Sequence, residues 1–157
     1  MTEDPYEAVV LANIAKFGWH VAAIPADSDV PSFAYTIGLM ETFAHPEMIL
    51  FGLALETTHG IFSTMVKEIG NGISFSDPGR YPNTIQDYDV FIQRIDETQH
   101  EYYLGYAMWH RRHVGKLGTL NAVQVVWPDG LGTFPWEAGF HEPNRNLQPT
   151  LWEPHVE

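Results

Sequence analysis

The 157-residue sequence contains no cysteine, and this absence excludes several kinds of chemistry. Without cysteine the chain can form no disulfide, bind no metal through thiolates and use no thiolate nucleophile. Positive charge is also scarce, because 8 Lys and Arg stand against 20 Asp and Glu, which gives a formal net charge of −12. Such a surface repels phosphate backbones, so we expect no nucleic-acid partner.

Long apolar runs and a basic leader are missing as well. No stretch approaches the ~18–20 apolar residues of a membrane-spanning helix, and residues 1–4 are acidic rather than basic, unlike a secretory signal. We therefore expect a cytoplasmic protein without a membrane partner. Hydrophobic residues make up 45% of the chain and aromatic residues 13%, which predicts a single folded domain over residues 1–157.

Hydrophobic periodicity and turn residues predict about three helices and five or six strands. The first helix is expected after Asp4, whose side chain suits an N-cap, and ends at Gly18. The expected helices cover residues 5–17, 55–69 and 98–114, and the expected strands cover residues 19–24, 33–40, 48–53, 73–75, 88–95 and 120–127. Prolines and glycines predict irregular structure in residues 77–84 and 128–157.

These elements do not alternate strictly between strand and helix, as a doubly wound fold requires. We predict an α+β fold with a mostly antiparallel sheet, or a partly open, split-barrel-like barrel, and about three helices packed outside. The strands at residues 19–24 and 33–40 are expected to pair as a hairpin. The irregular C-terminal segment, residues 128–157, is expected to pack back on the sheet.

One motif that can carry chemistry runs from Tyr35 to Glu47, where the strand sequence Tyr-Thr-Ile-Gly-Leu precedes a His-Pro-Glu turn. Gly38 leaves room for a backbone or a ligand to approach the strand closely. The structural interpretation is a turn held by local hydrogen bonds. The functional interpretation makes His45 a general base or polar anchor, with Tyr35 as hydrogen-bond donor and Glu47 as a further catalytic group. Thr36 and Gly38 would then contact a cofactor.

A second motif, at residues 123–136, is an apolar strand that runs into a loop with two tryptophans, two prolines and two glycines. The structural interpretation is a lid that ties the C-terminal segment to the sheet, with Asp129 capping backbone amides. The functional interpretation makes Trp127, Asp129 and Trp136 the wall of a small-molecule pocket, where indole rings stack on a planar ligand. A lid and a wall are compatible.

The expected helix at residues 98–114 places two tyrosines and two histidines on one face. His110 and His113 would hold a metal ion if further ligands joined them. The candidates to complete such a site are His20, His45, Glu41 and Glu47. A pair spaced i, i+3 lacks the His-Glu-x-x-His pattern of metalloproteases. We therefore favour a packed aromatic helix, with Tyr106 and His110 as candidates for a pocket wall.

The end of this helix carries the main local concentration of positive charge, formed by Arg111, Arg112 and Lys116. The structural interpretation is a solvated helix end, where cations complement the helix dipole. The functional interpretation is a small anion-binding patch beside a pocket. The sequence favours the structural interpretation and leaves the functional one open.

These motifs carry a resemblance to a known family. The chain resembles the bacterial family called domain of unknown function 4262 at residues 35–39, 45–47, 123–136 and 148–151. The resemblance covers about residues 15–151 of the chain. It implies an architecture but no particular reaction.

A looser similarity concerns a flavin cofactor. Residues 44–50, a proline-containing turn and an apolar strand, are similar to the flavin-phosphate site of flavin-reductase-type split barrels. Thr36 and Thr42 would be the available phosphate donors, but no arginine is close in sequence. Flavin is therefore the cofactor to consider first, as an analogy at the level of the fold.

Three functional hypotheses follow from the sequence. We favour a small-molecule or cofactor-binding enzyme with an aromatic-lined pocket, with a flavin-dependent oxidoreductase as its specific form and a homodimer as a compatible assembly. The first alternative is an acidic interaction or immunity-type protein without catalysis, because common nucleophile and phosphate-loop motifs are absent. The second alternative is a metal-dependent hydrolase with histidine ligands.

Overall fold

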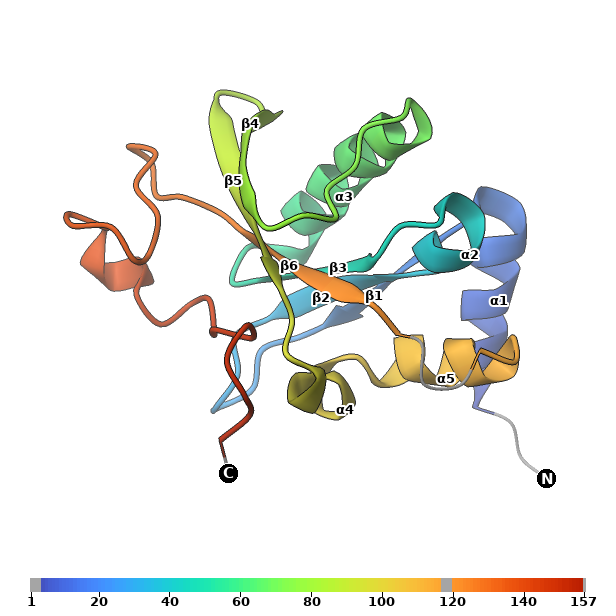
Figure 1. The fold of residues 1–157 in the computed structure, drawn as a ribbon. Coiled ribbons are helices and arrows are strands. Elements are labelled where there is room, and N and C mark those ends of the chain that lie inside the picture. The colour runs from blue at the N-terminus through green and yellow to red at the C-terminus, as the bar shows by residue number, and fades with distance from the viewer. Residues whose placement is uncertain (1–3, 117–119, 157) are drawn as a thin grey trace.

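A computed structural model of the protein describes residues 4–116 and 120–156. Its centre is a six-stranded sheet with helices on both faces (Figure 1). In chain order the elements are α1 (Pro5–Phe17), β1 (His20–Ile24), β2 (Phe33–Ile37), α2 (Leu39–Phe43), β3 (Glu47–Phe51), α3 (Leu55–Gly70), β4 (Gly79–Ile85), β5 (Tyr88–Arg94), the 3-10 helix η1 (Glu97–Gln99), α4 (His100–Tyr103), α5 (Gly105–His113), β6 (Ala122–Val126) and the 3-10 helix η2 (Glu142–Asn144). None of the helices within these ranges is long and apolar enough to cross a membrane.

The sheet has the strand order β1-β2-β3-β6-β5-β4. β3 and β6 run parallel, with Glu47 beside Ala122, and the other neighbouring strands are antiparallel. These pairings confirm the predicted α+β fold with a mostly antiparallel sheet. Over the described residues β1 and β4 are edge strands, so the sheet is open and does not close into the alternative barrel. The same residues form five α-helices rather than the expected three.

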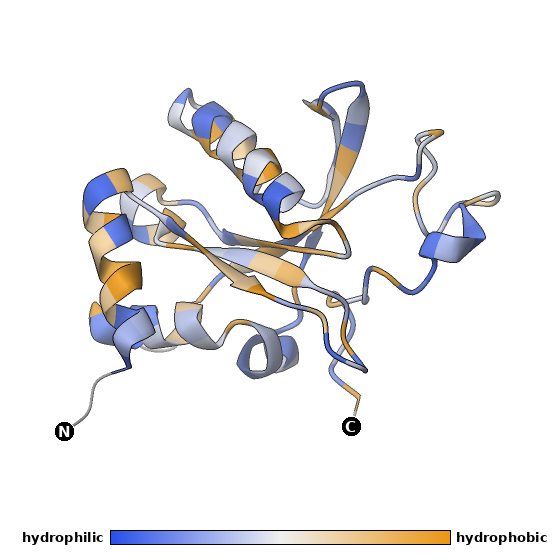
Figure 2. Cartoon of the chain, turned by 180° about the vertical axis from the view of Figure 1, so that it is seen from behind, coloured by the Kyte–Doolittle hydropathy of each residue, from blue (hydrophilic) through white to orange (hydrophobic). Residues whose placement is uncertain are grey.

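Two apolar cores lie on opposite faces of the sheet. Because successive side chains of a strand point to opposite faces, Met48 and Leu50 of β3 pack toward α3, while Ile49 and Phe51 pack toward α1 and α5. All four side chains are fully buried, as the apolar sequence of this central strand predicts. Figure 2 shows hydrophobic segments along the central strands and on the helices that cover them.

The N-terminal helix and hairpin confirm the sequence prediction. The carboxylate of Asp4 accepts a hydrogen bond from the backbone amide of Tyr6 at 2.8 Å and caps α1. Gly18 ends the helix in the left-handed region, with a φ of 89°. β1 and β2 then pair antiparallel, with Ala22 beside Tyr35.

The sequence prediction was wrong after α3. Residues 73–75 form no strand, and residues 77–84, expected as a loop, contribute most of β4. Pro82 fits there because β4 is an edge strand, where a missing backbone donor need not cost a sheet hydrogen bond. Asn83 has a φ of 54° and lies where the register of β4 against β5 shifts, so the hairpin is bent.

The strand expected at residues 33–40 is shorter than predicted. β2 ends at Ile37, Gly38 has a φ of 105°, and the short helix α2 begins at Leu39. An added Cβ at Gly38 would lie 3.2 Å from the backbone oxygen of Gly18, so the end of α1 also approaches closely here. The turn into α2 therefore depends on glycine.

The helix expected at residues 98–114 is divided into η1, α4 and α5. The break is at Leu104, which leaves the helical region with φ −118° and ψ 34°. The backbone amide of Tyr106 donates to the hydroxyl of Tyr35 at 3.1 Å instead of joining a continuous helix. A contact with β2 thus overrides the local helical pattern.

Candidate functional site

Glu47 is the most completely hydrogen-bonded buried carboxylate of the described structure. Its two oxygens accept hydrogen bonds from the hydroxyl of Thr36 at 2.8 Å and from the backbone amides of Gly38, Leu39 and Met40 at 3.1, 3.2 and 3.3 Å. Burial raises the pKa of Glu47 to about 7, although the hydrogen bonds from Thr36, Met40 and Leu39 oppose the shift. The carboxylate therefore occupies the N-terminus of α2 and joins it to β2 and β3.

His45 is buried two residues before Glu47, in the turn between α2 and β3. The backbone amide of Phe75 donates to Nε2 at 2.9 Å, so Nδ1 carries the proton and donates to the carbonyl of Pro46 at 2.8 Å. Burial lowers the pKa of His45, while the hydrogen bond to Pro46 opposes the shift. Both ring nitrogens thus join backbone segments, and the catalytic role of His45 stays a prediction.

Tyr35 and Tyr106 lie together at the junction of β2, α5 and α1. The Tyr35 hydroxyl accepts from the Tyr106 amide, and the Tyr106 hydroxyl donates to Asp4 at 2.8 Å. Burial raises the pKa of Tyr35. The ring of Tyr106 also packs edge-on against Tyr6, whose hydroxyl lies 2.7 Å from Nε2 of His20. This pair therefore belongs to a polar network between helices and sheet.

His110 is buried and lies 3.3 Å from a carboxylate oxygen of Glu41 in α2, which also pairs with Arg111. His113 packs against the ring of Trp109. Among the described residues no group of three or more His, Cys, Asp or Glu side chains is placed to hold a metal ion. The candidate metal ligands, namely His110 and His113 with His20, His45, Glu41 or Glu47, therefore do not form a metal site in the described structure.

The tryptophan loop lies at the other end of β3. The indole of Trp127 donates to the carbonyl of Phe51 at 2.6 Å. The carboxylate of Asp129 accepts from three loop amides, those of Leu131, Thr133 and His141. These amides, that of Thr133 first, lower the pKa of Asp129. Trp136 is 46% exposed and packs among the rings of Phe91, Phe134 and Trp152.

Two buried glutamines hold the C-terminal segment: Gln148, which belongs to the family motif at residues 148–151, and Gln124, which the sequence analysis did not identify. The side chain of Gln148 accepts from the backbone amide of Trp127 at 3.0 Å and donates to its carbonyl at 2.9 Å. Gln124 donates to the carbonyl of Pro149 at 2.7 Å and accepts from the amide of Leu151 at 3.0 Å. A glutamine in an otherwise apolar strand was the signal that the sequence offered, because a buried side-chain amide needs an acceptor for its NH₂ group and a donor for its oxygen.

A cleft of about 1270 Å³ opens beside the His-Pro-Glu turn, and we call it the α5 cleft. It lies between α4 and α5 on one side and the adjoining ends of β5 and β6 on the other. Its lining residues are Pro46, Ser76, Arg94, Ile95, Glu97, Thr98, His100, Glu101, Tyr102, Met108, Arg111, Arg112, Leu120, Asn121, Ala122, Val123 and His155. None of the ten predicted catalytic and cofactor-binding residues lines this cleft.

Within the described residues, the lining of the α5 cleft includes a histidine with an unpartnered buried nitrogen and two solvent-exposed arginines without a carboxylate partner. Nε2 of His100 is buried and has no hydrogen-bond partner there. Burial lowers the pKa of His100, although Glu97 and Asp96 oppose the shift. Arg94 and Arg112 form no ion pair with any carboxylate of the described ranges. The cleft thus has donors to offer to a ligand.

The comparisons with known proteins identify a family. A family model described as "Domain of unknown function (DUF4262)" matches residues 13–141. This match confirms the resemblance carried by the strand, turn and loop motifs. Searches of curated proteins and of solved structures give no match. Because the family description names no activity, the geometry has to support any functional inference.

Proposed function

We propose, from the premise that this chain belongs to the family of domain of unknown function 4262, that it binds a small organic molecule in the α5 cleft. The observation that carries the proposal is His100, a lining residue of the cleft whose buried Nε2 has no partner in the described structure. Buried polar atoms are nearly always hydrogen-bonded, and each exception calls for an explanation such as a ligand.

The size and walls of the α5 cleft support this proposal. Its volume of about 1270 Å³ exceeds the roughly 300–1,000 Å³ of usual ligand pockets, so a molecule of cofactor size fits. Tyr102 and His155 lie on its lining with stacked rings, 3.5 Å between centroids and 8° between planes. These rings offer an aromatic wall from residues other than the tryptophans expected from the sequence.

The proposed activity is that of an enzyme whose substrate or cofactor lies against His100. Since burial lowers the pKa of His100, the imidazole is mostly neutral near pH 7 and can accept or donate one proton. His100 is therefore the acid–base candidate that the α5 cleft supports best.

Flavin is the specific cofactor to test first, but not at the threonines that the split-barrel analogy indicates. The hydroxyl of Thr36 bonds to Glu47 and to the amide of Met48, and the hydroxyl of Thr42 bonds to the carbonyl of Gly18. A flavin would instead lie in the α5 cleft, where arginines are available. Titration with flavin mononucleotide, followed by its fluorescence, tests this form of the proposal.

Native mass spectrometry of the protein purified without chelator tests the general proposal. The expected result is a bound organic mass, which denaturation removes, and the same spectrum reports whether the protein is a monomer or a homodimer. His100→Phe should lose this mass, because Phe keeps the ring but offers no hydrogen bond. His141→Phe is the control, since its side chain is exposed outside the cleft. Retention of the mass by His100→Phe would contradict the proposal.

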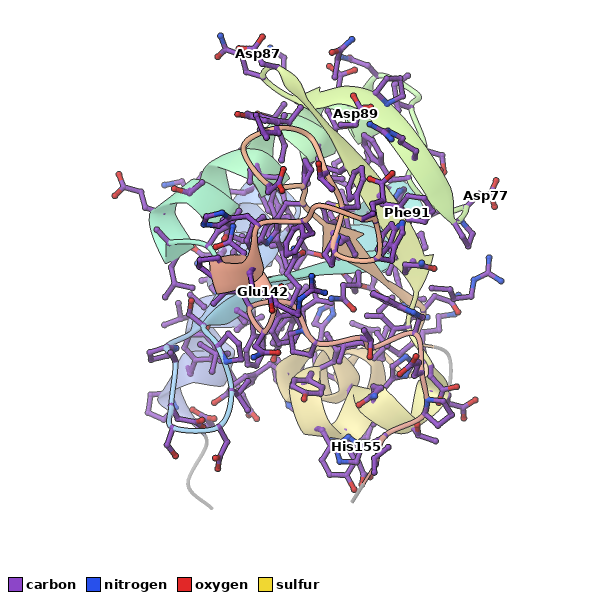
Figure 3. All side chains as sticks on the ribbon, turned by 90° about the vertical axis from the view of Figure 1, so that its left-hand side faces the viewer. Asp77, Asp87, Asp89, Phe91, Glu142 and His155 are labelled. Carbon is purple, nitrogen blue, oxygen red and sulfur yellow. The ribbon has the colours of Figure 1, made fainter. Side chains whose placement is uncertain are left out.

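An acidic interaction protein is the second candidate. Figure 3 shows Asp77, Asp87 and Asp89 around the β4–β5 hairpin, at the opposite end of the view from His155. Together with the net charge of −12, this hairpin supports a basic protein partner. Replacing Asp87 by Lys should then weaken capture of such a partner, while ligand binding in the α5 cleft should not change.

A further inference from the structure

We propose that the ligand of the α5 cleft carries an anionic group, a phosphate or a carboxylate, that Arg94 and Arg112 bind. This inference rests on the proposed function and specifies the chemistry of the molecule at the same site. It is carried by the different surroundings of the five arginines of this chain.

Three arginines have carboxylate partners. Arg80 pairs with Asp89 at 2.7 Å, Arg145 pairs with Glu142 at 2.8 Å, and Arg111 pairs with Glu41. In a chain with 20 acidic residues against 8 basic ones, such pairing is the ordinary outcome. The two arginines without a carboxylate partner in the described ranges, Arg94 and Arg112, both line the α5 cleft.

A helix dipole does not explain both positions. Arg112 lies in the last turn of α5, where a cation complements the helix C-terminus. Arg94, however, is the last residue of β5 and has no helix end of its own to complement. The feature that the two side chains share is the cleft between their elements, so the cleft is the better explanation.

Arginine is also the side chain best suited to this task. Its planar guanidinium presents donors in a fork that matches both oxygens of a carboxylate or phosphate. An anion bound in the cleft gains charge-assisted hydrogen bonds from each guanidinium group that it contacts. His100 lines the same cleft, and its buried Nε2 has no partner among the described residues.

Two carboxylates on the cleft have to be weighed against this inference. Glu97 in η1 and Glu101 in α4 also line the cleft. Neither forms an ion pair with Arg94 or Arg112 in the described structure. The carboxylates belong to the segment of η1 and α4, and the arginines to β5 and α5, so the anion is expected between β5 and α5 rather than beside η1 and α4.

The experiment is an NMR titration of the full-length protein with inorganic phosphate, at ionic strength held constant with chloride. Saturable shifts are expected for the side-chain Nε–Hε signals of Arg94 and Arg112 and not for that of Arg145. A parallel titration with acetate shows whether the site prefers a phosphate or a carboxylate. Equal, unsaturable shifts at all three arginines would overturn the inference.

Matched variants sharpen this titration. Arg94→Gln and Arg112→Gln should each weaken anion binding about tenfold, because each removes charge-assisted hydrogen bonds. Arg145→Gln, which removes an arginine paired elsewhere, should leave the affinity unchanged. An unchanged affinity in both cleft variants would overturn the inference.

The failure of this inference is distinguishable from that of the proposed function. If Arg94→Gln and Arg112→Gln retain a bound organic mass as tightly as the unmodified chain, the ligand is not held by these arginines, although the cleft still binds it. If phosphate saturates the two arginines but no organic molecule binds, the anion site stands and the proposed function fails.

Discussion

Two neighbouring polar regions, which meet at Pro46, differ in how completely their buried groups are paired. The first region is the turn of His45, Pro46 and Glu47, which we call the Glu47 turn. There the carboxylate of Glu47 and both nitrogens of His45 have partners, most of them backbone groups. In the α5 cleft, a buried nitrogen of His100 has no partner within the described residues, and two solvent-exposed arginines have no carboxylate partner there. The groups of the first region therefore stabilise the fold, whereas the second region has hydrogen-bonding groups and positive charge that a ligand can bind.

Replacing Glu47 by Ala should have the largest effect on stability. The change leaves four donors, three of them buried, without an acceptor, and the expected loss is about 4 kcal/mol of the free energy of unfolding. Urea denaturation at pH 7 measures it. Glu68→Ala, at an exposed position of α3, is the control. A loss below about 1 kcal/mol would show that Glu47 does not hold α2 in place.

The pH dependence of stability should show the next largest effect. Because burial raises the pKa of Glu47 from 4.5 to about 7, the stability linked to its protonated form is fully present below pH 4.5 and is lost as the pH rises through 7. The loss approaches about 3 kcal/mol above that range. Glu47→Gln should lack this component, while the histidines titrate in both proteins. If the free energies of unfolding of the two proteins changed in parallel between pH 5 and 8, the raised pKa of Glu47 would be contradicted.

Replacing His45 by Ala should have an intermediate effect on stability and none on ligand binding. The imidazole joins the carbonyl of Pro46 to the amide of Phe75, and its removal should cost about 2 kcal/mol. His141→Ala is the exposed control. Thermal unfolding and ligand retention, measured on the same samples, check both parts. Loss of the ligand with an unchanged melting temperature would instead support the catalytic role predicted from the sequence.

The smallest effect on stability is expected at the α5 cleft. His100→Phe removes a buried polar atom that has no partner in the described chain, so the free energy of unfolding should change by less than about 1 kcal/mol. Denaturation curves with and without ligand measure this. A large loss without ligand would show that His100 supports the fold rather than a bound molecule.

The sequence predicted those parts of the fold that local patterns determine. The capped α1, the hairpin of β1 and β2 and the doubly buried β3 all follow from residues within their own segments. It failed where distant contacts decide, since Glu47 turns the end of β2 into α2 and Tyr35 divides the expected last helix.

The α5 cleft could not be predicted in the same way. Its lining comes from segments spread between Pro46 and His155, and most of them carry ordinary surface residues. The positive charge at Arg111 and Arg112 was the signal in the sequence, and a solvated helix end was the favoured interpretation of it. Only the folded chain shows which arginines lack a carboxylate partner.

Native mass spectrometry of His100→Phe beside His45→Ala decides whether the ligand lies in the α5 cleft. The two variants change one histidine in each of the neighbouring regions. We expect His100→Phe to lose the bound organic molecule, whereas His45→Ala keeps it despite a lower melting temperature. Loss of the molecule from His45→Ala with retention by His100→Phe would instead place the ligand site at the Glu47 turn.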